Sequence, residues 1–427
     1  MPNGRDIPAA PQVVDAHNPV RNTPDGRLNA GASMLDEEEV QEVLAVIKSR
    51  SLSRDYGPDC LHTVLRFEQG FARQTGARYA LAVTSGTAAL KVALVAAGVG
   101  PGHEVIVPCC TFIATPGSVA LAGAVPVFAE VDESLTMDPD DVEQKITPRT
   151  KAIMPVHLSG VPCRMDRIVE IARRHNLRVV EDCAQSCGTV YQGRQIGTWG
   201  DLGAFSLQFS KVITSGEGGV VTSGDPDLYE RAVRYHDQGV FRERNRFPGF
   251  SPHLEEFVGE NYRMNELTGA VALRQLSKMD RITATMRARF RRFKTGVSDI
   301  RNLRLRPVND EDGHLGARWG LAFDDAETCE RFSKALRAEG LSPGLSYGGT
   351  PVYMNPQILN QLAATPEGNP WKSPAYKGSV SYGKGLCPKS EDILRRVLLI
   401  ASINPKYTDR DVDDIVGAVR RAAGVAL

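Results

Sequence analysis

Short, uniformly apolar segments alternate with helical patterns between residues 79 and 184. The segments YALAV (79–83), EVIVP (104–108) and VPVFAEV (125–131) are separated by small residues and helical patterns. Strands without polar alternation are typical of a parallel sheet that helices cover on both faces. KAIMPVHL (151–158) and RVVEDCA (178–184) continue the series. The sequence therefore predicts an α/β fold.

Two later segments, GAFSLQFS (203–210) and GGVVTS (218–223), are joined by a short connection. A short connection suits antiparallel pairing, so we expect part of the sheet to be antiparallel. Open α/β sheets bind their ligands at the carboxyl ends of the strands. We therefore expect chemistry directly after five residues, namely Val83, Pro108, Leu158, Asp182 and Ser210.

The pattern changes in the last third of the chain. Helical patterns cover 227–239 and 265–295, and a polar, proline-broken loop lies between them. Beyond them, strand-like RWGLAFD (318–324) and SVSYG (379–383) mix with helices, which is typical of a smaller α+β domain. The sequence predicts a flexible N-terminal arm at 1–30, a large domain at 31–282 and a small C-terminal domain at 283–427.

The composition argues against several classes of function. Lys plus Arg and Asp plus Glu each number 51, so the net charge is zero, which is unlike a nucleic-acid-binding protein. No apolar stretch is long enough to span a membrane and the N-terminus lacks a signal-peptide layout, so we expect a cytoplasmic location. The eight cysteines are scattered and are expected to be reduced. A zinc site at Cys183 and Cys187 is the alternative, but we predict no metal.

The segment TSGTAAL (84–90) follows a strand and opens a helix. Free N–H groups at such a helix start favour an anion, and Ser and Thr hydroxyls add donors. Simple capping by Ser85 or Thr87 is the alternative explanation. The segment has no GxxxxGK[ST] pattern, and AGVGPG (97–102) precedes a strand where a dinucleotide turn would follow one. Nucleotide sites of these two kinds are therefore not expected.

Acids and a lysine fall at neighbouring strand ends. Glu181 and Asp182 end an apolar strand, so they mark either a surface turn or a carboxylate aimed at a cationic ring nitrogen. Lys211 follows the next segment and is either a solvated charge or a buried amine that attacks a carbonyl. An anion site, an acid for a ring nitrogen and a lysine for an aldehyde together fit pyridoxal phosphate (PLP). Phe112 is either a core residue or a cover for one ring face.

The sequence resembles the sugar and cyclitol aminotransferases of the DegT/DnrJ/StrS family, which are fold-type-I PLP enzymes of the aspartate aminotransferase superfamily. The resemblance covers residues of about 30 to 420 and rests on five motifs in order: TSGTAAL (84–90), TFIAT (111–115), VVEDCAQSCG (179–188), GDLGAFSLQFSKVITSGEGG (200–219) and NYRMNELTGAVALRQL (261–276). It implies a three-layer αβα large domain with a mostly parallel seven-stranded sheet. It also implies PLP as the cofactor and a homodimer with shared active sites.

The resemblance gives roles to individual residues. Lys211 would form the Schiff base with PLP and then move the proton, and Asp182 would keep the pyridinium nitrogen protonated. Gln185 would lie near the ring and its 3-oxygen, and Phe112 would stack on the ring. The phosphate would be held by Gly86, Thr87 and Ser206, and by Asn261 reaching across from the neighbouring subunit.

Some residues depart from the family pattern, and they bear on the substrate. Cys183, Ser186 and Cys187 stand where relatives often have Ala, Ala and His, and Gln208 replaces a residue that is often aromatic or His. The presence of Lys211 favours transamination over the dehydration that lysine-lacking relatives perform. Glu217 in the GEGG turn is similar to the branch that handles cyclitol ketones and aminobenzoate precursors in antibiotic pathways.

The sequence thus predicts a PLP-dependent aminotransferase that uses L-glutamine or L-glutamate. The acceptor would be a keto-cyclitol or keto-sugar of aminoglycoside-type antibiotic biosynthesis. The alternatives are a PLP enzyme with another reaction (epimerisation, elimination or aminobenzoate-type ring formation) and a non-catalytic partner or regulator.

Candidate substrate-binding residues lie in two segments. The loop FRERNR (241–246) offers Arg242, Arg244 and Arg246 to a carboxylate or diphosphate, or is simply solvated. Tyr347 and Tyr353 in the second segment, SYGGTPVYMNP (346–356), suit a polyol because their hydroxyls can form hydrogen bonds.

Overall fold

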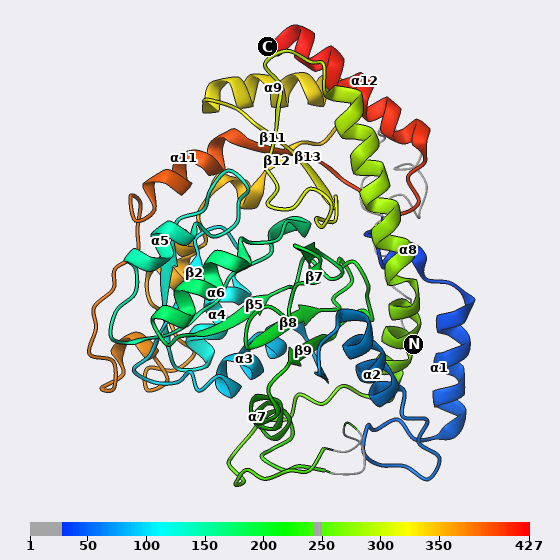
Figure 1. Cartoon of the computed structure of the whole chain (residues 1–427), viewed down its shortest axis with the longest axis vertical. Helices are drawn as coiled ribbons and strands as arrows, with labels where there is room; N and C mark the ends of the chain where they lie inside the picture. The colour runs from blue at the N-terminus through cyan, green and yellow to red at the C-terminus, as the bar shows by residue number, and fades with distance from the viewer. Residues whose placement is uncertain (1–27, 243–246, 248–249) are drawn as a thin grey trace, which may run out of the picture.

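The computed structural model describes residues 28–242, 247 and 250–427. Most of the predicted N-terminal arm (1–30) lies outside this part of the chain. The described residues build a large β-sheet, a small β-sheet and a two-stranded hairpin, and the long helix α8 (Glu266–Val297) runs beside the large and the small sheet (Figure 1).

The large sheet has seven strands and is mostly parallel, as predicted. Its spatial order is β1 (Tyr79–Val83), β9 (Gly219–Ser223), β8 (Leu202–Ser206), β5 (Arg178–Asp182), β4 (Thr150–Ile153), β2 (Glu104–Pro108) and β3 (Val125–Ala129). β9 runs antiparallel to both of its neighbours, and the other pairs in the sheet are parallel. The expected antiparallel element is therefore β9, which lies between β1 and β8.

Both faces of this sheet are buried, which explains why its strands lack polar alternation. On β1, Leu81 and Val83 pack into a core with helices α3 and α7, whereas Ala80 and Ala82 pack on the opposite face with α2 and α8. Further along that opposite face, α5 and α6 cover Ile153 and other strand residues. The helices of this region are α1 (Glu37–Ser49), α2 (Thr63–Thr75), α3 (Gly86–Ala96), α4 (Ala114–Leu121), α5 (Pro139–Gln144), α6 (Met165–Arg174) and α7 (Pro226–His236).

Helix starts follow the sequence closely. The acidic first turn of the predicted helix at 35–50 forms a capping box. The Asp36 side chain accepts a hydrogen bond from the Glu39 backbone N–H, and the Glu39 side chain accepts one from the Asp36 backbone N–H. Thr408 and Asp411 form the same arrangement at the start of α12 (Asp409–Ala426). These local hydrogen bonds fix where the helices begin.

The small sheet is antiparallel and contains β10 (Arg304–Leu305), β11 (Arg318–Ala322), β13 (Val397–Ser402) and β12 (Gly344–Leu345), in this spatial order. Helices α9 (Ala326–Ala338), α11 (Pro388–Arg396) and α12 accompany it (Figure 1). The remaining elements are the hairpin β6 (Val190–Tyr191) and β7 (Arg194–Gln195), and the short helix α10 (Pro356–Leu359). The predicted strand within RWGLAFD is confirmed as β11.

The predicted strand at 379–383 is wrong, because this segment is irregular. The carbonyl of Val380 accepts a hydrogen bond from the Gln361 side chain instead of from a neighbouring strand. Tyr382 donates to the backbone carbonyl of Pro126 and packs its ring edge against Phe128. Hydrogen bonds and packing of side chains therefore hold the segment where a strand pair was expected.

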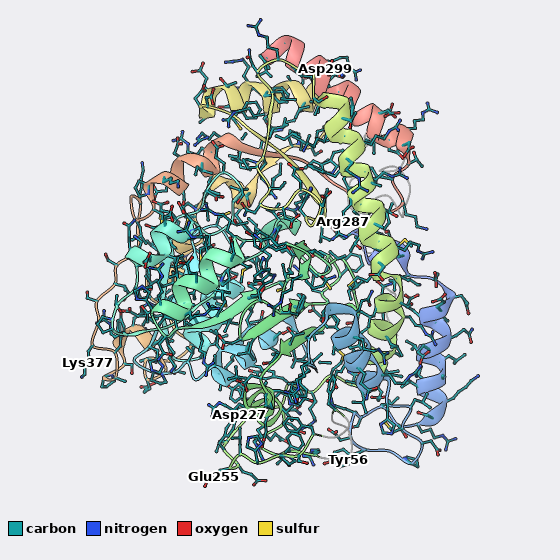
Figure 2. All side chains as sticks on the ribbon, viewed as in Figure 1. Tyr56, Asp227, Glu255, Arg287, Asp299 and Lys377 are labelled. Carbon is teal, nitrogen blue, oxygen red and sulfur yellow. The ribbon has the colours of Figure 1, made fainter. Side chains whose placement is uncertain are left out.

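Helix α8 passes through the predicted domain boundary at residue 282 without a break. Met286 still packs with the core beside the large sheet, whereas Phe290 and Phe293 pack with the core of the small sheet. Arg287, labelled in Figure 2, donates to the backbone carbonyls of Gly188 and His314 and so fixes the middle of α8. The division into domains at 282/283 remains our proposal.

None of the helices in the described part of the chain has both the length and the hydropathy of a membrane span. All eight cysteines are free thiols, and all except Cys60 are buried.

A buried ion pair ties the edge strand β1 to the segment before α2. Arg54 donates to both carboxylate oxygens of Glu68, at 2.6 and 2.7 Å, and both side chains are almost fully excluded from solvent. Glu68 also accepts a hydrogen bond from the backbone N–H of Ala82 on β1. Removal of either partner would leave an uncompensated charge in the interior.

Replacing Glu68 by alanine is expected to lower the free energy of unfolding by roughly 3–5 kcal/mol, because Arg54 would stay buried without its carboxylate. Urea unfolding followed by circular dichroism measures this change. Glu330→Ala, which breaks an exposed pair with Lys334 on α9, is the control and should leave the unfolding midpoint unchanged. Equal effects of both substitutions would contradict the prediction.

Candidate active site

A cavity of about 600 Å³ lies at the carboxyl ends of the strands of the large sheet. Each of the five positions where chemistry was expected contributes to its wall. The contributing residues are Ser85, Gly86 and Thr87 after β1, Thr111 and Phe112 after β2, Ser159 after Leu158, Ala184 and Gln185 after β5, and Lys211 after Ser210. The parallel strand directions therefore bring together residues that are far apart in the sequence.

Close packing fixes the wall formed by the start of α3. Gly219, the first residue of β9, pairs with Val83 on one side and with Ser206 on the other. A Cβ atom added to Gly219 would lie 2.3 Å from the Ser85 carbonyl oxygen, and one added to Gly86 would lie 2.7 Å from the Ser206 Cβ. Only glycine allows these approaches.

The same wall is rich in hydrogen-bond donors. Ser85 caps α3 by accepting a hydrogen bond from the Ala88 N–H, so the capping interpretation is correct. Helical geometry still leaves the N–H groups of Gly86 and Thr87 without intrahelical acceptors. Both residues, and Ser206, line the cavity. The capping and anion-site interpretations are therefore compatible.

The two acids at the end of β5 point in different directions. Glu181 is buried and accepts hydrogen bonds from the backbone N–H groups of Gly197 and Gly200, and it contacts His157. Asp182 lines the cavity and accepts from the Thr115 hydroxyl at 2.8 Å and from the Ala184 N–H at 3.1 Å. The alternation of a strand thus assigns Glu181 to structure and Asp182 to the site.

Burial disfavours the ionised form of Asp182. Desolvation raises the pKa of this carboxyl above its usual range, whereas the hydrogen bonds from Ala184 and Thr115 and the charge of Lys211 oppose the rise. A cation placed beside Asp182 inside the cavity would favour the ionised form further.

Lys211 lies beyond the end of β8, in the turn that leads to β9, and not on the strand itself. Its backbone carbonyl accepts a hydrogen bond from Gly31, and its backbone N–H donates to Gln208. Across the described residues, its Nζ forms no hydrogen bond or ion pair. Burial lowers the pKa of this amine, with Asp182 acting against the shift and Arg318 adding to it. The amine is therefore more easily neutralised than a solvated one.

Aromatic and amide side chains border the cavity opening. Phe112 is 57% exposed, which excludes the core interpretation, and its ring lines the cavity. Gln185 donates to the Tyr347 hydroxyl at 2.8 Å and accepts from the Ser159 N–H, so it links the turn after β12 to the loop after β4 across the site. Tyr347 has a left-handed backbone (φ 49°) and lines the cavity as predicted.

Other predicted residues do not reach this cavity. Tyr353 is fully buried and donates to Glu391, so its predicted position at the pocket border is wrong. Arg242 donates to the buried Asp237 and stacks over Tyr56 instead of lining the site. Arg244 and Arg246 lie outside the described residues. Asn261 is exposed on the surface, where its backbone pairs with Asp237.

Comparison with known proteins decides the family. A model of the DegT/DnrJ/EryC1/StrS aminotransferase family matches residues 33–420. The chain belongs to this family. The resemblance inferred from the motifs is confirmed, and the protein is a PLP-dependent transaminase.

Individual relatives of this aminotransferase match it over different lengths. It is 34% identical over 393 residues to the spore coat polysaccharide biosynthesis protein SpsC of Bacillus subtilis (strain 168), covering 91% of this chain and 95% of SpsC. It is 44% identical over 238 residues to GDP-perosamine synthase of Caulobacter vibrioides, covering 53% of this chain and 62% of that protein. The crystal structure of S. venezuelae DesV in complex with a ketimine intermediate superposes with a TM-score of 0.76 at 30% identity, covering 91% of this chain and 94% of DesV.

The cavity of the aminotransferase also contains residues that the sequence did not single out. Thr115 lies within the motif TFIAT, and its contact with Asp182 becomes visible only when β2 and β5 are placed in one sheet. Arg318 reaches the cavity from β11 of the small sheet. No local sequence pattern marks Arg318, because the packing of the two sheets brings it to the site.

The lowered pKa of Lys211 predicts unusual reactivity of its amine. In cofactor-free protein, acylation of Lys211 should reach half of its maximal rate at a lower pH than acylation of the exposed Lys334, because burial favours the neutral amine. Peptide mass spectrometry after brief labelling across a pH series measures both sites in one sample. A midpoint for Lys211 at or above that of Lys334 would contradict the prediction.

Proposed function

We propose that this aminotransferase moves an amino group from L-glutamine or L-glutamate to the carbonyl carbon of a nucleotide-linked keto-sugar. One observation carries the proposal: a half-buried lysine without a partner among the described residues shares a cavity with a buried aspartate and a donor-rich helix start. Neutral amine, carboxylate and anion site are the groups that a PLP-dependent transfer requires.

The residues of the cavity fit PLP at each of its polar ends. The crowding of Gly86 against Ser206 leaves a small, donor-rich cradle at the start of α3, and a phosphate suits it. We assign the phosphate to Gly86, Thr87 and Ser206. The ring nitrogen is assigned to Asp182, with Gln185 near the 3-oxygen and Phe112 over one face of the ring. The aldehyde is assigned to Lys211.

PLP, when bound, withdraws electrons from the substrate carbon and makes its proton acidic. Lys211 Nζ would take up that proton from the substrate carbon and return it at the former aldehyde carbon, which requires a neutral amine near working pH. Burial supplies this condition by lowering the pKa of Lys211. The Asp182 carboxylate, oriented by Thr115 and the Ala184 N–H, stabilises positive charge on the ring nitrogen. Phe112 and Tyr347 line the same cavity beside these groups.

The choice of a sugar acceptor rests on the relatives. GDP-perosamine synthase carries a nucleotide-linked amino sugar in its name, and SpsC is named for polysaccharide biosynthesis. The GEGG turn with Glu217, which lines the cavity, supports the keto-cyclitol of an antibiotic pathway as the second candidate. A panel of nucleotide keto-sugars and keto-cyclitols with either donor decides between them.

Lys211 is expected to be essential for a normal rate of amino transfer. Lys211→Ala should lower the rate of amino transfer by about 10²- to 10⁴-fold, because the general acid–base group is lost. Borohydride reduction followed by mass spectrometry should show PLP attached to residue 211 only in the wild-type protein. Lys334→Ala, which changes an exposed lysine, should keep the wild-type rate. A Lys211→Ala protein with native activity would refute the assignment.

We further propose that the enzyme works as a homodimer. Val40 (55% exposed), Leu44 and Ile47 form an apolar stripe along the outer face of α1, and Leu35 and Leu52 extend it. Exposed apolar residues in one continuous stripe are typical of an interface. Asn261, exposed and outside the lining of its own cavity, is assigned to the phosphate of the partner's site.

Acidic substitutions in the apolar stripe of α1 should weaken the association of the two subunits. Val40→Glu combined with Ile47→Glu is expected to weaken dimerisation at least 100-fold, because each apolar side chain buried in an interface contributes roughly 1.5–3 kcal/mol. Analytical ultracentrifugation measures the dissociation constant. Val425→Glu, at a site that is 84% exposed on α12, is the control and should leave the assembly unchanged. A double variant that associates like the wild-type protein would exclude this stripe as the interface.

A further inference from the structure

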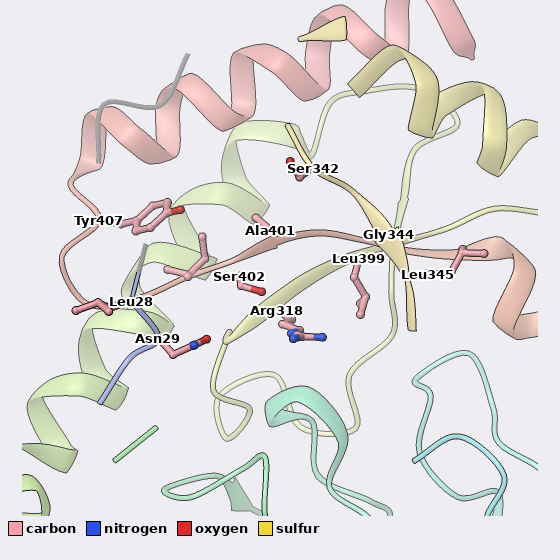
Figure 3. A pocket seen from close by; sticks show the side chains of 11 residues that line it. Leu28, Asn29, Arg318, Ser342, Gly344, Leu345, Leu399, Ala401, Ser402 and Tyr407 are labelled. Atoms are coloured by element: carbon pink, nitrogen blue, oxygen red, sulfur yellow. The ribbon is translucent and has the colours of Figure 1, made fainter. Parts of the chain in front are cut away.

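A second cavity of about 440 Å³ adjoins the one that contains Lys211. It lies against the small sheet, and Leu345, Leu399 and Tyr407 form part of its apolar lining (Figure 3). The residues common to both cavities are Asn29, Arg318, Ser402 and Ile403. The two spaces therefore meet at a wall that β11 and β13 supply.

Arg318 is the charged residue of this shared wall. It is the first residue of β11 and pairs with Ser402 of β13, so the small sheet fixes its backbone. Figure 3 shows its side chain near Ser402, and Asn29 lines the same cavity. The side chain of Arg318 is exposed to the cavities. Within the described part of the chain, its guanidinium has no hydrogen bond and no ion pair.

The surroundings of Arg318 favour an anion. The smaller cavity has no acidic residue in its described lining. In the larger cavity, the acids Asp182 and Glu217 both act on Lys211, and Lys211 itself is cationic when protonated. Arg306 is buried near Arg318, and its two terminal nitrogens have no partner among the described residues. Asp132 acts on Arg306, whereas no described acid pairs with Arg318, so a bound carboxylate would supply the missing counter-charge.

We infer that Arg318 binds the α-carboxylate of the amino-acid donor at the junction of the two cavities. This inference rests on the proposed function, and it holds for L-glutamine and L-glutamate alike because both carry this group. The α-carboxylate is one carbon away from the amine that must reach Lys211, so it belongs beside the reacting atoms. A guanidinium offers two parallel N–H groups to a carboxylate, which fixes the orientation of the donor.

The position of Arg318 also suits the remainder of the donor. With the amine directed to Lys211 and the carboxylate held at the shared wall, the side chain of the donor extends into the second cavity. Asn29, Ser342 and Ser402 provide neutral polar groups there, and Leu345 and Leu399 provide apolar contacts. The charge of Arg318 reaches Lys211, since it contributes to the lowered pKa of that amine.

The half-reaction with the donor tests this inference on the PLP-loaded enzyme. The rate of loss of the PLP absorbance is measured against the concentration of L-glutamine or L-glutamate. In Arg318→Gln, the donor concentration for half-maximal rate should rise about 10- to 100-fold, because a charge-assisted hydrogen bond contributes about 1.5–3 kcal/mol. Arg318→Lys should restore part of the loss. The KM for the keto acceptor should change by less than about twofold, as expected if Arg318 serves only the donor.

A matched control comes from the same sheet. Arg304 on β10 pairs with Glu133 and Asp324 and lines neither cavity, so Arg304→Gln should behave like the wild-type enzyme. Glutarate, a dicarboxylate without an amine, serves as a probe that cannot react. Calorimetry on the PLP-loaded enzyme should show weaker glutarate binding in Arg318→Gln and unchanged binding in Arg304→Gln.

Two results would overturn the inference: a normal donor dependence in Arg318→Gln, or a loss confined to the KM of the keto acceptor. The proposed function fails in a different way. If the wild-type enzyme reacts with neither amino acid while its glutarate binding still depends on Arg318, the carboxylate subsite stands and the assigned donor does not.

Discussion

A single antiparallel strand separates β1 from β8, and the tight packing around its first residue organises the active site. Gly219 of β9 pairs with the last residues of both neighbours, close enough to the Ser85 carbonyl to leave no room for a side chain. This packing presses the start of α3 against Ser206 and places the turn that carries Lys211 at the same sheet edge. One steric constraint therefore shapes the cradle, and the turn with Lys211 lies at the same sheet edge.

The electrostatics of the site depend on that geometry. Asp182 and Lys211 are both drawn away from water, which shifts the pKa of each toward its neutral form, and each charge partly counteracts the shift of the other. Buried charges are costly without partners. The hydrogen bonds from Thr115 and Ala184 offset part of this cost for Asp182. The Nζ of Lys211 forms no hydrogen bond with the described residues, which leaves it free to react.

Local patterns were sufficient to predict the strands of the large sheet and the five positions that meet at their ends. They failed where long-range packing decides the outcome. The segment at 379–383 has the composition of a strand, but anchoring of Tyr382 at Pro126 and Phe128 replaces strand pairing. Tyr353 has the chemistry of a substrate ligand, but its hydroxyl is used by Glu391 inside the core. Lys211 was placed at a strand end, whereas it lies in the turn that follows.

Arg318 is a residue of the site that the sequence could not single out, also because long-range packing places it there. Its position at the start of a strand in the small sheet contains no motif, and the sheet order alone brings it to the cavity. The motif residues, in contrast, follow strands of one parallel sheet, whose ends must converge. Sequence reasoning thus recovers the part of the site that one sheet builds and misses the part contributed by the other.

Helix α8 limits how far the two sheets can move relative to each other. Its 32 residues form one uninterrupted rod whose two ends belong to different cores. Residues of the small sheet, such as Leu399, also share a core with Val105 and Val107 of the large sheet. A hinge motion between the two sheets would have to bend this rod and expose that shared apolar contact. The continuous helix and this shared core therefore both oppose relative motion of the two sheets around the cavity.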